Sequence, residues 1–207
     1  MKPQVHPDQY FGENYLKKKR FISYWHQIHE ISSREPQSIL EIGIGNGLVS
    51  NYLKQIGYNI ITIDIDGRLH PDIAGSVLNI PFQDNSFDLV ACFEVLEHIP
   101  YDKFTQALSE LHRISSNYVI LSVPDRTQVY PVYIRIPKLG ALQILIPIPR
   151  LKAPRHKFDG EHYWEIGKAG YPIENVMEKI KNTGFEIIQT YRVFENPYHR
   201  FFVLIKV

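Results

Sequence analysis

The chain has 207 residues, a length that suits a single α/β domain over 1–207 with a sizeable core. Its 23 basic and 22 acidic residues give a net charge of +1, so no overall electric field recruits nucleic acid or an anionic membrane. The N-terminal residues lack the apolar core of a signal peptide, and the single cysteine, Cys92, cannot form an intrachain disulfide. We therefore expect a cytoplasmic protein.

Predicted strands and helices alternate along the chain, which indicates a mostly parallel sheet with helices on both faces. Residues 1–35 are interpreted as a helical cap, whose helix carries Phe21, Ile22, Trp25 and Ile28 on one face. Pro172 and Gly184 mark the two ends of a late helix. Further strands are expected at 38–40, 60–63, 89–93, 118–123, 185–193 and 201–207, and further helices at 48–56 and 104–111.

The most informative segment is a turn with glycine at alternate positions, Glu41-Ile42-Gly43-Ile44-Gly45-Asn46-Gly47, between an apolar strand and an amphipathic helix. Glycines at such a turn let a ligand approach bare main chain, where a Cβ would collide. Seventeen residues after Gly47, the next strand ends in Asp64. A carboxylate at that point can accept hydrogen bonds from both hydroxyls of a ribose. The pattern predicts a nucleoside site.

Two further motifs follow in order, IPFQDNSFDLV at 80–90 and FEVLEH at 93–98. With the glycine turn they resemble the class I S-adenosylmethionine-dependent methyltransferases, and more narrowly the type 11 small-molecule group, over roughly residues 38–123. The resemblance implies a doubly wound, mostly parallel seven-stranded α/β sheet with a C-terminal antiparallel strand, and S-adenosylmethionine as cofactor. It implies cofactor contacts from Glu41, Gly43, Gly45, Asn46, Gly47, Asp64, Ile65, Ser76, Val77, Leu78, Phe93, Glu94 and His98.

The sequence departs from this family pattern at two places. Only residues 67–71, with a proline among them, separate Asp66 from the short segment 72–74, so the usual helix between the second and third strands is expected to be missing. Counting back from Pro81, the family's adenine-contacting aspartate falls on Ser76, which lacks the charge that strengthens such a bond. Adenine is then expected to depend more on the apolar neighbours.

Candidate catalytic groups lie near the fourth strand and late in the chain. Glu94 ends that strand, where ligand sites gather in open α/β sheets, and His98 follows one helical turn later. If the acceptor is a hydroxyl or carboxyl group, His162, Glu165 or His98 can remove its proton, although a purely structural role for His98 is equally open. No metal site is expected, because Cys92 is remote and no H-E-x-x-H helix is present.

Residues 130–165 are interpreted as an insert that covers the substrate site. Its first part is rich in isoleucine, leucine and proline, flanked by basic residues, and too short to span a bilayer. A dimer surface and an interfacial membrane contact through 134–150 are the alternatives to a lid. The protein is expected to be a monomer or a homodimer.

The predicted activity is methyl transfer to the oxygen or nitrogen of a small or lipid-like acceptor. One alternative is a catalytically silent protein that only binds the cofactor. A nucleic-acid methyltransferase is disfavoured, because residues 93–96 read FEVL where such enzymes carry an N-P-P-Y-type tetrapeptide.

Overall fold

The computed structural model describes residues 3–13, 15–138, 140–150 and 152–207. Residues 1, 2 and 14 of the predicted cap, and residues 139 and 151 of the predicted insert, lie outside this part. Seven strands form one sheet in the order β3-β2-β1-β4-β5-β9-β8, in which β9 is antiparallel to both of its neighbours and the other neighbours run parallel. The predicted fold class is therefore confirmed. The strands are β1 (Ile39–Ile42), β2 (Ile60–Asp64), β3 (Ile73–Ala74), β4 (Phe87–Phe93), β5 (Ser115–Pro124), β8 (Phe185–Arg192) and β9 (His199–Lys206).

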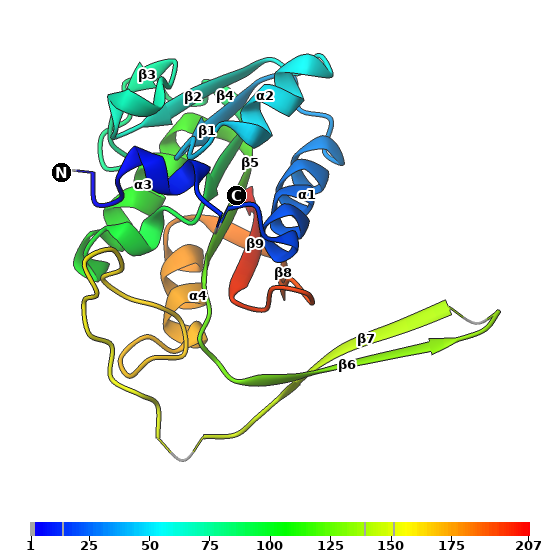
Figure 1. Cartoon of the computed structure of the whole chain (residues 1–207). Coiled ribbons are helices and arrows are strands. Elements are labelled where there is room, and N and C mark those ends of the chain that lie inside the picture. The colour runs from blue at the N-terminus through cyan, green and yellow to red at the C-terminus, as the bar shows by residue number, and fades with distance from the viewer. Residues whose placement is uncertain (1–2, 14, 139, 151) are drawn as a thin grey trace.

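Helices cover both faces of the sheet (Figure 1). Side chains alternate along β4, so Leu89 and Ala91 pack in the same cluster as helices α1 (Lys18–Ser32) and α2 (Leu48–Gln55). Val90 and Cys92 pack on the other face with α3 (Phe104–Ile114) and α4 (Ile173–Asn182). Among the described residues, no helix is long and apolar enough to cross a bilayer.

The buried face of α1 differs from the predicted one. Phe21 and Trp25 are exposed, at 46% and 57%, and the helix buries Ser23, Tyr24, Gln27, Glu30 and Ile31 instead. Polar residues are tolerated there because they have partners: the Tyr191 hydroxyl and the Arg34 guanidinium both donate to the Glu30 carboxylate. Hydrophobic periodicity alone could not show these partners.

Between β2 and β3 there is only the three-residue 3₁₀ turn Gly67–Leu69, so the predicted absence of a helix here is confirmed. Asp72 fixes this connection, because its carboxylate accepts from the backbone N–H and the hydroxyl of Thr62 at 2.8 Å each. Three further 3₁₀ turns, Pro7–Phe11, Leu96–His98 and Tyr101–Lys103, lie elsewhere in the chain.

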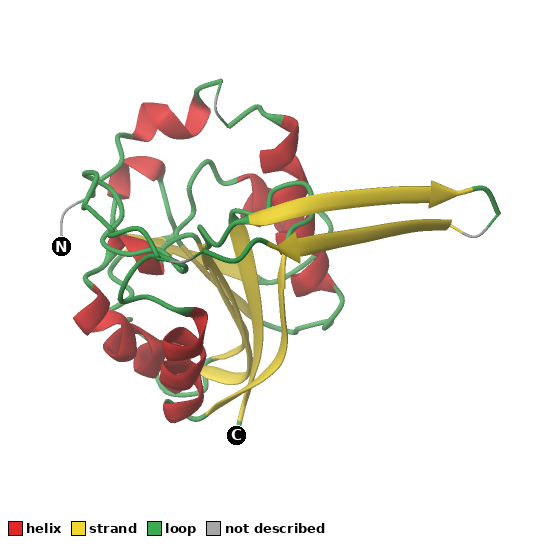
Figure 2. Cartoon of the chain, turned by 90° about the horizontal axis from the view of Figure 1, so that it is seen from below, coloured by secondary structure: helices red, strands yellow, loops and turns green. Residues whose placement is uncertain are grey.

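The first part of the predicted insert is a two-stranded antiparallel hairpin, β6 (Val129–Ile136) and β7 (Gly140–Pro147). It leaves the body of the protein after β5 and projects away from it, as both views show (Figures 1 and 2). The chain then returns through an irregular segment to α4.

Candidate functional site

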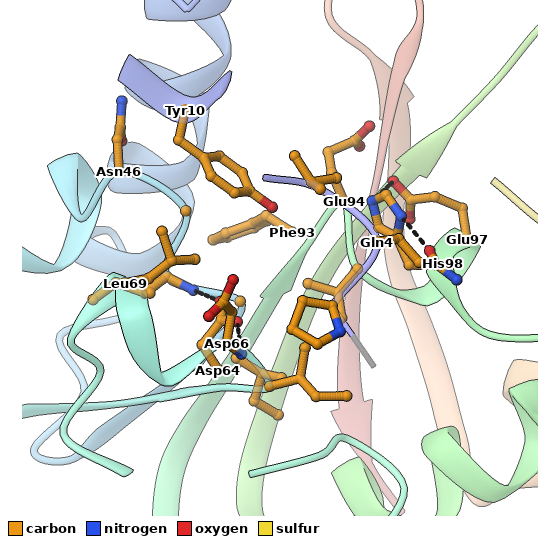
Figure 3. A pocket seen from close by; sticks show the side chains of 18 of the residues that line it. Gln4, Tyr10, Asn46, Asp64, Asp66, Leu69, Phe93, Glu94, Glu97 and His98 are labelled. Carbon is orange, nitrogen blue, oxygen red and sulfur yellow. Dashed lines mark hydrogen bonds and ion pairs between the residues drawn. The ribbon is translucent and has the colours of Figure 1, made fainter. Parts of the chain in front are cut away.

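A cavity of about 340 Å³ lies at the carboxyl ends of β1, β2 and β4 (Figure 3). One wall consists of the glycine turn and Asp64, and the opposite wall contains Glu94, Glu97 and His98. Residues from the N-terminal segment 3–10, from α1, and from positions 161–162 and 198–199 complete the lining. Parallel strands that end at one edge of the sheet explain why these segments meet here.

The glycine turn presents bare main chain to the cavity. Gly43, Gly45 and Gly47 all have positive φ values, of 85°, 53° and 71°, in the region that side chains disfavour. A Cβ at Gly43 would collide with the Val95 side chain, and a Cβ at Gly45 would lie 3.6 Å from the Tyr10 ring. Tyr10 belongs to the first 3₁₀ turn, so the N-terminal segment lies against the glycine turn at the cavity.

Asp64 holds the glycine turn in place. Its Oδ2 accepts from the backbone N–H of Ile44 at 2.9 Å, and its Oδ1 accepts from that of Asp66 at 2.8 Å. Burial raises the pKa of Asp64, while these backbone hydrogen bonds act in the opposite direction. Each carboxylate oxygen has a second lone pair, so the group can still accept hydrogen bonds from a ligand in the cavity.

Glu41 is a buried carboxyl group at the start of the turn. It is 3% exposed, and burial raises its pKa to about 8. Its Oε2 finds no hydrogen-bond partner among the described residues. Such a group can accept a cationic ligand group, which would favour the ionised carboxylate.

Glu94 begins the opposite wall in a strained conformation. Its φ is +53°, an uncommon value outside glycine that directs the backbone out of β4. The Ser122 hydroxyl donates to its Oε1 at 2.8 Å, and the His199 Nε2 lies 3.6 Å from its Oε2. Burial raises the pKa of Glu94 to about 7, so it can change protonation state near neutral pH.

Three groups that we call the acid–histidine cluster meet beyond Glu94: Glu97, His98 and His162. Their possible ligand atoms lie within 4.8 Å of one another, close enough to surround one metal ion. However, burial and then the charge of Glu94 raise the pKa of Glu97 well above its ordinary value, and burial lowers that of His98 to about 4. Both shifts favour the uncharged forms of Glu97 and His98.

The two histidines of the cluster differ in their partners. His98 Nδ1 lies 3.0 Å from the carbonyl oxygen of Glu161, so Nδ1 carries the proton and Nε2 keeps a free lone pair. His162 Nδ1 lies 3.3 Å from the Glu165 carboxylate, and the two imidazole rings are 5.0 Å apart. Burial opposes the charged form of His162, but the hydrogen bond and charge of Glu165 outweigh that effect, so the pKa of His162 is raised.

Glu165 lies behind His162 with four partners. The Tyr198 hydroxyl donates to it at 2.6 Å and Arg126 at 3.2 Å, and Lys168 lies 3.8 Å away. Burial acts to raise the pKa of Glu165, but the hydrogen bonds from His162 and Tyr198 and the Arg126 charge lower it to about 2. Glu165 is thus a permanently ionised group that orients the imidazole of His162.

Most of the predicted site residues come together around the cavity, but three do not line it. The lining includes Glu41, Gly43, Gly45, Asn46, Asp64, Ile65, Ser76, Val77, Phe93, Glu94, His98 and His162. Gly47, Leu78 and Glu165 lie outside this lining. Of the described residues in the predicted insert 130–165, only Glu161 and His162 line the cavity, so in this structure the hairpin does not cover it. The hairpin projects outward in this structure, and the role of the insert 130–165 as a cover of the substrate site stays a prediction.

Some lining residues were not named among the predicted site residues, although the predicted N-terminal cap 1–35 includes Gln4, Tyr10 and Tyr24. Gln4 and Tyr10 come from the N-terminal segment, and Tyr198 and His199 from the end of the chain. Tyr24 accepts a hydrogen bond from Asn46 Nδ2 at 3.2 Å, which links α1 to the glycine turn. Only the clustering of aromatic residues between 10 and 24 offered a signal in the sequence.

Comparison with known proteins agrees with the three sequence motifs. Residues 40–121 match a family model described as a methyltransferase domain. The chain is 24% identical over 193 residues to the ubiquinone biosynthesis O-methyltransferase of Cupriavidus pinatubonensis, covering 86% of this chain and 71% of that protein. A shorter match, 28% identical over 104 residues, is to the 18S rRNA (guanine-N(7))-methyltransferase of Mus musculus and covers 42% of this chain and 37% of that protein. Across such relatives the chain covers from about a third to 71% of their length.

The fold is also found in solved structures. The magnesium protoporphyrin IX methyltransferase of Synechocystis, crystallised with S-adenosylhomocysteine, superposes with a TM-score of 0.64 at 15% identity, covering 97% of this chain and 92% of that chain. At this identity the likeness concerns the fold. The family match and the shared fold confirm the resemblance inferred from the motifs.

Proposed function

We propose that this chain, a member of the class I S-adenosylmethionine-dependent methyltransferases, transfers a methyl group from S-adenosylmethionine to an oxygen or nitrogen atom of a small or lipid-like acceptor. One observation carries the proposal. A single cavity joins a bare glycine turn and a ribose-type carboxylate on one wall to a histidine with an orienting carboxylate on the other.

The cofactor would occupy the wall formed by β1 and β2. The bare glycine turn would let the cofactor approach main-chain groups closely, and Asp64 would accept hydrogen bonds from the ribose hydroxyls. The unpartnered carboxyl of Glu41 would pair with the ammonium group of the methionine part. Ile65, Ser76 and Val77 line the side where adenine would lie.

Methyl transfer from a sulfonium is an in-line displacement: the acceptor lone pair forms the new bond to carbon while the carbon–sulfur bond breaks. The protein contributes alignment of the two reactants and exclusion of water. The N-terminal residues Gln4 and Tyr10 line the cavity and support both roles.

For an oxygen acceptor we assign His162 as the base and Glu165 as the residue that positions it. The Nδ1 proton of His162 faces Glu165, which leaves Nε2 as the atom with a free lone pair. Glu165 does not line the cavity, and its low pKa makes it a poor base. His98 is a second base, weaker because its pKa is lowered to about 4. An amine acceptor that is already neutral would need neither.

The relatives leave the acceptor class open, since they include both a ubiquinone O-methyltransferase and an rRNA methyltransferase. The cavity favours a small acceptor, because its acceptor wall is formed by acidic groups, the half-buried Glu94 and the buried Glu97, which do not attract a phosphate backbone. A silent binding protein would have no use for a histidine held by an ionised carboxylate beside the cofactor wall.

The test is transfer of labelled methyl from S-adenosylmethionine to three substrate pools: a lipid extract, polar metabolites, and RNA. We expect label in lipid or small-molecule products; label only in RNA, or none in any pool although the cofactor binds, would contradict the proposal. Gly45→Leu should abolish binding of S-adenosylhomocysteine, because the side chain would fill the cavity. Gly57→Leu is the matched control, since Gly57 also has a positive φ of 98° but its Cβ would face open space.

A further inference from the structure

The near-neutral net charge conceals an uneven distribution of charge along the chain. Residues 126–158 contain seven basic residues and no acidic residue, whereas the rest of the chain has 16 basic and 22 acidic residues. The seven are Arg126, Arg135, Lys138, Arg150, Lys152, Arg155 and Lys157. Within the described residues only Arg126 forms an ion pair, with Glu165. The hairpin and its base are thus an exposed cationic segment.

The hairpin has one face that is wholly apolar. Its register pairs Tyr130 with Ile146, Val132 with Ile144, and Ile134 with Leu142. Since side chains alternate along each strand, these partners share one face with Ile136. Apart from Val132, which is half-buried, these side chains are between 43% and 64% exposed. The apolar face of the hairpin is therefore Tyr130, Val132, Ile134, Ile136, Leu142, Ile144 and Ile146.

The opposite face is mixed in character and is the one that contacts the body. It carries Tyr133, Arg135 and Gln143, and Gln143 Nε2 donates to the Glu195 carboxylate at 3.5 Å. The apolar face lies on the other side of the hairpin from this contact. An isolated two-stranded hairpin is marginally stable in water, and a contiguous exposed apolar surface of this kind marks an interaction site.

We propose that the apolar face of the hairpin docks on the surface of a membrane that contains anionic lipids. Two properties of the hairpin match that partner: aliphatic side chains that can enter the acyl boundary, and basic residues at the tip and base of the same segment that attract anionic headgroups. Tyr130, on the apolar face, has the amphipathic ring that is enriched at the headgroup level.

The hairpin lies on the membrane and does not span it. Both of its strands have an open edge, and unpaired backbone groups are not tolerated in the hydrocarbon region. A second copy of this chain is a poorer partner for the same face. Two such segments would repel each other electrostatically, and Pro131 and Pro147 remove N–H donors that edge-to-edge pairing would use.

Docking would bring the cavity close to the lipid surface. The base of the hairpin is fixed beside the cavity wall, because the Arg126 backbone N–H donates to the Ile166 carbonyl at 2.8 Å and its guanidinium contacts Glu165. Glu165 in turn contacts His162, which lines the cavity. The inference extends the proposed function to acceptors that reside in a membrane, but lipid binding itself requires neither cofactor nor methyl transfer.

The test is co-sedimentation of the full chain with vesicles of phosphatidylcholine containing phosphatidylglycerol, and with phosphatidylcholine alone, without cofactor. We expect binding to the anionic vesicles that weakens as salt is raised. The double variant Ile134→Glu/Ile144→Glu should lower the partition coefficient by about tenfold or more. The matched control is Tyr133→Glu/Ala141→Glu, which makes the same charge change on the opposite face of the hairpin and should lose much less.

Three results would overturn the inference. One is equal or absent binding to the two kinds of vesicle. Another is an equal loss of vesicle binding in both double variants, which would show that binding depends on net charge and not on the apolar face. The third is a wild-type dimer that Ile134→Glu/Ile144→Glu dissociates, with no vesicle binding, which would identify the face as a contact between copies. Unchanged affinity for S-adenosylhomocysteine in both variants shows that the body remains folded, so failure here is distinguishable from failure of the proposed function.

Discussion

Replacing Asp64 with alanine tests the cofactor wall most directly. The carboxylate is 8% exposed and holds the backbone N–H groups of Ile44 and Asp66. In the proposed complex it also accepts from the ribose hydroxyls. The substitution therefore removes direct ligand contacts and loosens the glycine turn that approaches the cofactor.

The expected loss follows from these hydrogen bonds. A hydrogen bond to a charged group contributes about 1.5–3 kcal/mol net, because each one replaces a bond to water. Since the cavity is open enough to admit water in place of the lost oxygens, we expect a total loss of about 1–3 kcal/mol in Asp64→Ala. That range corresponds to a dissociation constant about 5 to 150 times higher.

Calorimetric titration with S-adenosylhomocysteine measures this loss without knowledge of the acceptor. Asp72→Ala is the control, because Asp72 also accepts from a backbone N–H, that of Thr62, but does not line the cavity. Wild-type affinity in Asp64→Ala, or an equal loss in Asp72→Ala, would refute the reasoning and place the ribose elsewhere.

Four further predictions follow from the same geometry. Glu41, with a pKa raised to about 8, should lose its proton when it pairs with the cofactor's ammonium. Affinity for S-adenosylhomocysteine should therefore rise as the pH approaches 8, and the calorimetric binding heat should depend on the ionisation heat of the buffer. Glu41→Gln should remove this proton release. With a hydroxyl acceptor, turnover should rise with pH through the raised pKa of His162, because the neutral imidazole is the base. Glu165→Gln should move this rise to lower pH. His162→Ala should lower kcat about 10²–10⁴-fold and leave the cofactor affinity unchanged. Trp164→Ala should lower the free energy of unfolding in urea by about 3–5 kcal/mol, because the indole is fully buried and its N–H donates to the Leu96 carbonyl. Dialysis against EDTA should leave turnover unchanged, because displacement at a sulfonium carbon needs no Lewis acid.

The sequence allowed the arrangement of the glycine turn and Asp64 to be predicted, because its determinants are local. A strand, a glycine turn and a helix are consecutive in 39–55, and Asp64 ends the neighbouring strand. Glycine spacing and strand-end acids report backbone conformation and sheet position directly, without knowledge of distant contacts. The missing helix after β2 was predictable for the same reason, since five residues with a proline cannot form one.

Other features could not be predicted, because they depend on partners far along the chain. The buried face of α1 includes Glu30, which is acceptable only since Tyr191 donates to it across 161 positions of sequence. The hairpin was expected to be a lid because an apolar, proline-rich segment does not reveal in which direction it leaves the fold. Within 130–146, apolar side chains recur at every second position of each strand, a pattern that is typical of strands.

The acceptor wall depends on tertiary contacts that bring distant segments together. The Trp164 indole N–H donates to the Leu96 carbonyl at 3.0 Å, and the Tyr163 backbone N–H donates to that of Glu97 at 2.8 Å. These two bonds attach the segment that carries His162 to the strand end that carries His98. The same segment continues from the hairpin, whose base contacts Glu165. A partner that holds the hairpin therefore acts on residues adjoining the proposed base, while the glycine turn and Asp64 belong to a different part of the fold. Acceptor use can thus change through the late segment while cofactor binding stays the same.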